Sequence, residues 1–287
     1  MIQSIHASTA HSVRLICETL GLPRSSYHHA ARPCARQLSD AELCPRIEAV
    51  FRQHQRRYGY RRIYHLLRQE GVTLSPDRVR RLMREAGLIA LQPKTYVPQT
   101  SDGRADKPSD NLLQGRPLPT KPNEVWAGDI TYIPSEQGWL YLAVVIDLCS
   151  RRIVGWCLRD HLRSDLVVEA LDSALAARRG TQGIIFHSDR GSQYGSSAFR
   201  QRLRAAGMEQ SMSARANPYH NAWTESFIGT LKAEMLRDGC FASPQDAAHE
   251  LFAFIGGYYN TRRLHSSLNY KSPSLFCLLY TSDAADE

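Results

Sequence analysis

The chain has 287 residues, and its 36 Lys and Arg against 28 Asp and Glu give a formal net charge of +8. This length exceeds that of a typical domain, so two modules are expected. An apolar fraction of 43% with 22% charged residues excludes a disordered chain, and no run approaches the roughly 18 apolar residues of a membrane span. We therefore expect a soluble, cytoplasmic protein with no membrane partner.

The basic charge is concentrated in the first part of the chain. Residues 1–120 hold 19 Lys and Arg against 10 Asp and Glu, whereas the remaining residues hold 17 against 18. A basic module joined to a near-neutral one indicates a polyanion-binding arm, with nucleic acid as the leading partner. The alternative is a basic face that is only solvated.

Two helices separated by a short connection are predicted near residues 61–70 and 75–86. Ser75 fits the position of an N-cap, Pro76 fits the first helical position, and Gly71 and Gly87 end the two helices. This is the pattern of a helix-turn-helix, and it predicts an all-α DNA-binding module over residues 1–90. Its candidate DNA contacts are the arginines that lie off the apolar stripe of the second helix: Arg78, Arg80, Arg81 and Arg84.

A Pro-rich linker is predicted over residues 91–122, and an α/β domain is predicted over residues 123–276. Three strands rich in β-branched and aromatic residues should form an antiparallel meander. Alternating helices and strands follow, which is the element order of a ribonuclease-H-like fold. The expected strands are 124–133, 139–148, 152–158, 183–189 and 209–213, and the expected helices are 164–178, 196–207 and 221–237.

Three acids occupy positions that predict metal chemistry. Asp129 lies within the first strand, Asp189 ends the fourth, and Glu225 lies in the first turns of a helix. A carboxylate within an apolar strand is costly to bury unless it is paired or binds a metal. Hard oxygen ligands favour Mg²⁺ or Mn²⁺, and two such ions can catalyse phosphodiester chemistry.

The spacing of the acids and the strings around them carry a family resemblance. Thirty-five residues separate Asp189 from Glu225, and HSDRGSQY, NAWTESFIGTLKAE and YNTRRLHSSLNYKSPSLF occur in this order. The chain resembles the D,D(35)E catalytic core of insertion-sequence transposases, which are relatives of retroviral integrases. It is most similar to the second-reading-frame product of the insertion-sequence-three family.

The resemblance implies an integrase catalytic core in which Asp129, Asp189 and Glu225 hold two Mg²⁺ or Mn²⁺ ions. It also implies that Lys232, on the same helix face as Glu225, contacts the end of the element. The expected activity is metal-dependent cleavage and strand transfer of double-stranded DNA during transposition. The expected partners are further copies of the chain and an upstream-frame DNA-binding protein, acting separately or as a fusion.

Two other functions fit parts of the pattern. One is a DNA-binding regulator with an inactive core, which would have no need of the intact triad. The other is a different ribonuclease-H-like nuclease, for which a helix-turn-helix and this spacing would be unusual.

Several nearby residues have structural interpretations. Asp147 is expected to cap the turn after the second predicted strand, and His187 to be a buried core residue. The segment Arg262–His265 either binds DNA or ends the last helix, and the four tryptophans are expected in the core. Residues 277–287, CLLYTSDAADE, resemble the in-frame translation of a transposon-end sequencing adapter, so we expect this segment to be an artefact outside the fold.

Overall fold

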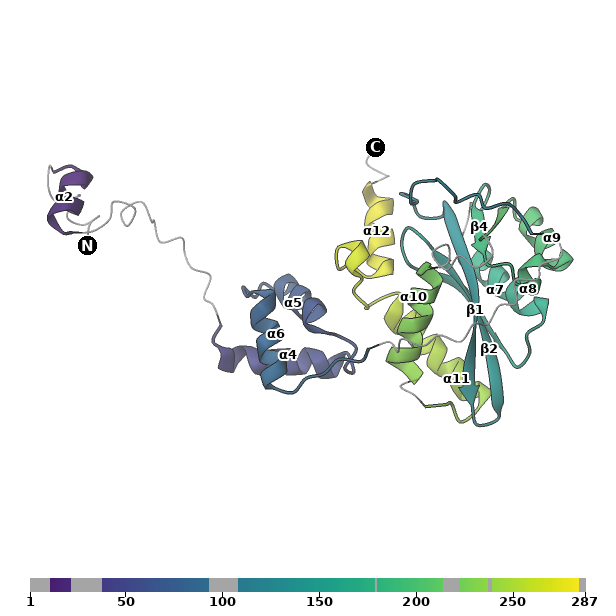
Figure 1. Cartoon of the computed structure of the whole chain (residues 1–287), viewed down its shortest axis with the longest axis horizontal. Helices are drawn as coiled ribbons and strands as arrows, with labels where there is room; N and C mark the ends of the chain where they lie inside the picture. Colours follow the sequence, from purple (N-terminus) through teal and green to yellow (C-terminus); the bar gives the residue numbers. More distant parts are fainter. Residues whose placement is uncertain are drawn as a thin grey trace. The chain divides into compact units, whose positions relative to one another are not determined.

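The computed structural model of the chain describes residues 11–21, 38–92, 108–178, 180–213, 222–236 and 239–283 (Figure 1). The chain divides into two compact units. The first unit comprises residues 1–55 and 63–89, and the second comprises residues 56–62 and 90–287. Most of the predicted linker (93–107), the start of the helix predicted at 221–237 and the end of the predicted artefact (284–287) lie outside the described residues.

Helices form the first unit, as the sequence predicts. They are α2 (Val13–Thr19), α4 (Asp40–Gln53), α5 (Tyr60–Gln69) and α6 (Pro76–Glu85). The first three residues of α5 belong to the second unit. Ser75 is the N-cap of α6 and accepts a hydrogen bond from the Arg78 amide. The helical spacing brings buried side chains from α4, α5 and α6, including Ile47, Ile63 and Val79, into one apolar core.

A mixed five-stranded sheet is the centre of the second unit. Its strands are β1 (Val125–Ser135), β2 (Gly138–Asp147), β3 (Ile153–Arg159), β4 (Ile185–Ser188) and β5 (Glu209–Met212), in the order β3-β2-β1-β4-β5. β1, β2 and β3 pair antiparallel, whereas β4 is parallel to β1 and β5 is parallel to β4. The predicted meander and the two later strands are confirmed.

Helices cover both faces of this sheet (Figure 1). α7 (Ser164–Ala177) and α9 (Ser197–Ala205) pack on one face, with the short α8 (Ser192–Gly195) beside them. α10 (Ala222–Leu231) packs on β1 and β2. Gly155 permits the close approach of α7 to β3, because a Cβ there would lie 2.3 Å from the carbonyl oxygen of Ala170.

The side chains of β1 alternate between the two faces of the sheet, and this alternation determines which of them reach α10. A Cβ at Gly128 would lie 2.6 Å from the ring of Phe186, which belongs to the core beneath α7 and α9. Neighbouring residues of a strand point to opposite faces. Asp129 therefore points to the face that α10 covers.

The chain after α10 is more irregular than the sequence suggests. Leu231 is followed by a π-helical turn, η2 (Lys232–Leu236), and α11 (Pro244–Phe252) by a second one, η3 (Ala253–Tyr259). A 3₁₀ turn, η4 (Ser266–Leu268), precedes α12 (Pro273–Asp283). The segment expected to lie outside the fold begins within α12, where Cys277 is buried; its origin as an artefact stays a prediction.

The second half of the predicted linker packs along β5. The Met212 amide donates to the carbonyl oxygen of Asp110 at 3.2 Å, and the Leu112 amide donates to Ser211 Oγ at 2.9 Å. Backbone hydrogen bonding thus gives this polar stretch a fixed position. None of the helices in the described ranges has the length and apolar character of a membrane span.

Candidate active site

Asp129 is the most strongly perturbed carboxyl group of the site. Its Oδ1 accepts a hydrogen bond from the Ile130 amide at 2.8 Å, and Thr224 at the start of α10 hydrogen-bonds to the same carboxylate. Burial, and then the negative charge of Asp189, raise the pKa of Asp129 to about 8. Asp129 therefore lies where a second negative charge is already present and water is scarce.

Asp189 reaches this position because β4 runs parallel to β1. Ala127 pairs with His187 across the two strands, and each acid follows two residues later. The Asp189 carboxylate accepts a hydrogen bond from the Gly191 amide at 3.0 Å, while the Arg190 side chain donates to the carbonyl oxygen of Ser213 at 2.9 Å. The strand register thus brings two carboxylates together.

Glu225 lies near this pair without completing it. It is an exposed residue of the first turn of α10 whose carboxyl group is only partly desolvated. This partial desolvation raises its pKa, and its charge helps to raise the pKa of Asp129. Within the described ranges, no three His, Cys, Asp or Glu side chains converge closely enough to form a metal-binding group.

The donor set nevertheless fits a hard divalent cation. Asp129 lies on β1 and Asp189 directly follows the adjacent strand β4, so the sheet fixes the backbone from which each carboxylate extends. Glu225 is on a helix whose preceding residue, Thr224, already contacts Asp129. Mg²⁺ and Mn²⁺ prefer such carboxylate oxygens and keep several waters as further ligands.

Lys232 lies in the electrostatic field of the site. Burial lowers the pKa of its ammonium group, and the charge of Asp129 opposes that shift. The sequence predicted that Lys232 lies within a continuous helix. In the structure it is instead the first residue of the π-helical turn η2. The negative charge of Asp129 therefore acts on the ammonium group of Lys232.

Tyr194 is a site residue that the sequence interpretation missed. It is 2% exposed, and burial together with the charges of Asp129 and Asp189 raises the pKa of its phenol well above the usual value. Its phenol stays neutral, and its hydroxyl oxygen would lie 3.1 Å from a Cβ at Gly128, the residue before Asp129. Its position in the string DRGSQY, five residues after Asp189, was the available signal.

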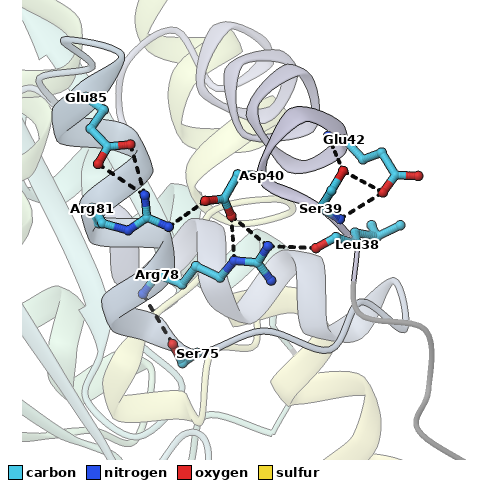
Figure 2. Close-up of polar contacts among 8 residues, drawn as sticks. All are labelled: Leu38, Ser39, Asp40, Glu42, Ser75, Arg78, Arg81 and Glu85. Carbon is cyan, nitrogen blue, oxygen red and sulfur yellow. Dashed lines mark hydrogen bonds and ion pairs between the residues drawn. The ribbon is translucent and has the colours of Figure 1, made fainter.

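The four arginines predicted to bind DNA lie on α6 in the first unit. Figure 2 shows that two of them, Arg78 and Arg81, hold the carboxylate of Asp40. Arg80 and Arg84 are exposed. The structure thus separates four residues that the sequence pattern treated as equivalent.

Asp147 and His187 have the expected structural positions. Asp147 is fully buried and accepts hydrogen bonds from the amides of Asn123 at 2.6 Å and Ser150 at 2.7 Å. His187 is fully buried with its Nδ1 2.9 Å from Ser211 Oγ. Of the tryptophans, Trp126 is in the core as predicted, but Trp139 is 59% exposed near the β1–β2 turn, so that prediction was wrong.

A buried ion pair gives Arg263 a structural role that neither interpretation, DNA binding or ending the last helix, described. Its guanidinium donates to both carboxylate oxygens of Glu234, with distances of 2.7 to 3.0 Å, and the two side chains are 7% and 5% exposed. The sequence interpretation missed Glu234. The signal was its position three residues after the buried Leu231, in the turn η2 that follows α10, where a buried charged residue needs a partner.

Comparisons with known proteins agree with this architecture. Residues 119–218 and 206–273 match family models described as integrase core domain, and residues 37–96 match a model described as HTH-like domain. The chain is 41% identical to a transposase for insertion sequence element IS904 of Lactococcus lactis, over 85% of this chain and 97% of that protein. It is 34% identical to transposase InsF for insertion sequence IS3A of Escherichia coli, over 92% and 93% of the two chains.

A solved structure with a similar fold is the HTLV-2 integrase catalytic core domain in complex with magnesium. It is 18% identical to this chain, with a TM-score of 0.41, and the match covers 54% of this chain and 96% of that one.

Proposed function

Because this chain belongs to the family of insertion-sequence transposases with an integrase core domain, we propose that Asp129, Asp189 and Glu225 are its catalytic triad. The chain is a transposase, an enzyme that acts in DNA transposition. The observation that carries the proposal is that Asp129 within β1 and Asp189 directly after the parallel strand β4 interact electrostatically, with the pKa of Asp129 raised to about 8.

Integrase cores depend on divalent metal, and the proposed cofactor here is a pair of Mg²⁺ or Mn²⁺ ions. Such a pair, when bound, activates an attacking oxygen and stabilises the leaving oxygen of a phosphodiester. The chain's own task is to supply charged oxygen ligands. Asp129 must release a proton to become one, so binding of the metal is expected to release protons and to strengthen as the pH rises toward about 8.

DNA binding is proposed to use both units. Lys232, on whose ammonium group the charge of Asp129 acts, is proposed to hold a phosphate of the bound element end. The basic face of α6 is proposed to contact duplex DNA as the second helix of a helix-turn-helix. Because transposition joins two element ends, the active form is proposed to be a homo-multimer; action with, or fusion to, an upstream-frame DNA-binding protein is proposed from the family resemblance.

The triad is tested by Asp129→Asn, Asp189→Asn and Glu225→Gln in the full chain. Each should reduce cleavage and strand joining with Mg²⁺ or Mn²⁺ to background and leave duplex binding intact, because the ligands are removed and the basic surfaces are not. Asp160→Asn, at an acid that is 81% exposed in the same unit, is the matched control and should cleave normally. Cleavage at the wild-type rate by any triad variant would remove that residue from the active site.

A further inference from the structure

Arg151, in the turn between β2 and β3, has a backbone conformation that arginine seldom adopts. Its φ is 60°, in the left-handed region that favours glycine because glycine has no Cβ. The hydrogen bonds of the turn hold it there. The Arg151 amide donates to the carbonyl oxygen of Asp147 at 2.9 Å, and the Asp147 amide donates to the carbonyl oxygen of Arg152 at 2.9 Å. A glycine would adopt this conformation at lower cost, so the arginine indicates that its side chain has a task.

The guanidinium of Arg151 lies over the indole of Trp223, the second residue of α10. Its central carbon is 5.6 Å from the centre of the ring, which is within the range of a cation–π contact. Burial lowers the pKa of Arg151. Its Nη1 is shielded from water and has no hydrogen-bond partner among the residues that the structure describes. A cation that has lost water gains more from the face of an aromatic ring than an exposed cation does.

Trp223 and the two residues after it determine how the first turn of α10 is rotated about the helix axis. Trp223 is held by Arg151, and Thr224 is fully buried and hydrogen-bonds to Asp129. Successive residues of an α-helix are about 100° apart. With Trp223 and Thr224 both fixed, one direction remains for the side chain of Glu225.

Phe227 continues the side of α10 on which Trp223 lies, because residues four apart share a helix face. The Phe227 ring meets Tyr259 edge-on, with the ring centres 4.7 Å apart. The charge of Tyr259 in turn acts on Arg151. Arg151 and Tyr259 therefore hold successive turns of this side, and Arg151 holds the turn that contains Glu225.

We propose that Arg151 is a positioning residue of the active site. By holding Trp223, its guanidinium fixes the rotation of the first turn of α10 and therefore the direction in which the Glu225 carboxylate extends. This inference rests on the proposed function, in which Glu225 is a metal ligand. Arg151 acts through Trp223 and supplies no ligand of its own.

Binding of Mn²⁺ to the full chain, followed by the electron paramagnetic resonance signal of the free ion, gives a readout that does not depend on cleavage. Arg151→Gly relieves the backbone and removes the guanidinium, and it should weaken Mn²⁺ binding about 10-fold, as the loss of a group that orients a ligand does. Arg151→Lys keeps a cation but loses the planar guanidinium, and its loss should be smaller. Trp223→Leu should match Arg151→Gly. Unchanged Mn²⁺ binding in Arg151→Gly would overturn the proposal.

Asn269→Gly is the matched control. Asn269 is an exposed residue with a φ of 51°, so the substitution makes the same change to glycine at another left-handed position. It should bind Mn²⁺ as the wild-type chain does. Weaker Mn²⁺ binding in Asn269→Gly, equal to that in Arg151→Gly, would show that the glycine rather than the lost guanidinium causes the effect and would overturn the proposal.

A double-mutant cycle with Glu225→Gln separates positioning from a general loss of structure. Glu225→Gln removes the carboxylate that Arg151 is proposed to orient, so adding Arg151→Gly should weaken Mn²⁺ binding no further. A second 10-fold loss in the double variant would show that Arg151 does not act through Glu225 and would overturn the inference alone. Wild-type Mn²⁺ binding and cleavage by Glu225→Gln itself would instead contradict the proposed triad, and the inference with it.

Discussion

Asp129, a proposed catalytic residue, lies where the folded chain disfavours its charged form. The position on β1 that lets Asp129 meet Asp189 also places its carboxylate where burial and a like charge disfavour ionisation. Because the pKa of Asp129 differs between the folded and unfolded states, the stability of the protein depends on pH. Between about pH 4 and 8 the folded chain keeps a proton on Asp129 that the unfolded chain has released, so this group lowers the stability of the metal-free protein as the pH rises through that window.

Asp129→Asn should therefore stabilise the metal-free protein while it abolishes cleavage. The neutral amide keeps the size of the side chain and removes the cost of the charge. We expect Tm near pH 8, in the presence of a chelator, to rise by about 2–4 °C, the shift that roughly 1 kcal/mol produces in a domain of this size. The difference from wild type should shrink toward pH 4, and a gap in Tm that is constant over this pH range would contradict the assignment.

The sequence drew attention to Asp129 because a carboxylate in an apolar strand has few explanations other than pairing or metal binding; its catalytic role stays a prediction. The sequence could not rank the arginines of α6. Their helical spacing is the same whether or not a carboxylate lies opposite, and Asp40 is 38 residues away from Arg78 along the chain. Ion pairs of this kind depend on how two helices pack, which local pattern does not encode.

At the scale of elements, the consecutive segments α10 and η2 contain several of the proposed site residues. Thr224 and Glu225 are at the beginning of α10, Lys232 begins η2, and Glu234 anchors the far end through Arg263. A buried pair with good geometry adds little net stability, but breaking one side leaves an uncompensated charge in the interior. The Glu234–Arg263 pair is thus expected to fix the position of this helix.

Arg263→Met should lower the free energy of unfolding by about 3–5 kcal/mol, because it leaves the Glu234 carboxylate buried without its partner. The double variant Glu234→Met and Arg263→Met should recover most of this loss. Denaturant unfolding measures both. Arg262→Met is the matched control, because Arg262 is exposed, and should have little effect; a double variant as unstable as the single one would show that the pair contributes more than charge compensation.

Strand and helix positions followed from the sequence where periodicity was strong, as in β1, β2, β3 and α7. The π-helical turns did not, because η2 and η3 differ from an α-helix by a small change in winding that has no residue signature in this stretch. The exposed Trp139 was missed for a related reason: a tryptophan near a hairpin turn has the same strand propensity whether the core reaches it or not.

At the scale of the whole molecule, the two units do not follow the order of the sequence. Residues 56–62 precede most of the helix-turn-helix but belong to the second unit. Tyr58 is fully buried there: its hydroxyl donates to the carbonyl oxygen of Arg262 at 3.0 Å and accepts from the Leu264 amide at 2.9 Å. Arg62 donates to the Leu264 carbonyl oxygen at 2.9 Å. A single domain boundary near residue 90 would therefore separate residues 56–62 from the residues to which they are hydrogen-bonded.

Arg57 extends the same set of contacts toward η2. Its Nε donates to the carbonyl oxygen of Glu234 at 3.2 Å, and its guanidinium lies 4.4 Å from the centre of the Tyr258 ring. Arg57 thus satisfies a backbone carbonyl group of η2, which directly follows the helix that contains Glu225. Residues 56–62 therefore help to fix the position of that helix. We therefore expect a substitution at residue 58 to change the stability of the second unit.

Tyr58→Phe should destabilise the second unit by about 1–3 kcal/mol, because it leaves the amide of Leu264 and the carbonyl oxygen of Arg262 without the hydroxyl that satisfies them. Hydrogen exchange should show faster exchange of the Leu264 amide and reduced protection of the sheet, with the amides of α6 unchanged. Tyr64→Phe is the matched control in the first unit, where the lost hydroxyl accepts a bond from Arg68 at 3.2 Å in an exposed position; it should change stability by less than about 0.5 kcal/mol. Loss of protection confined to α6 in Tyr58→Phe would assign residue 58 to the first unit instead.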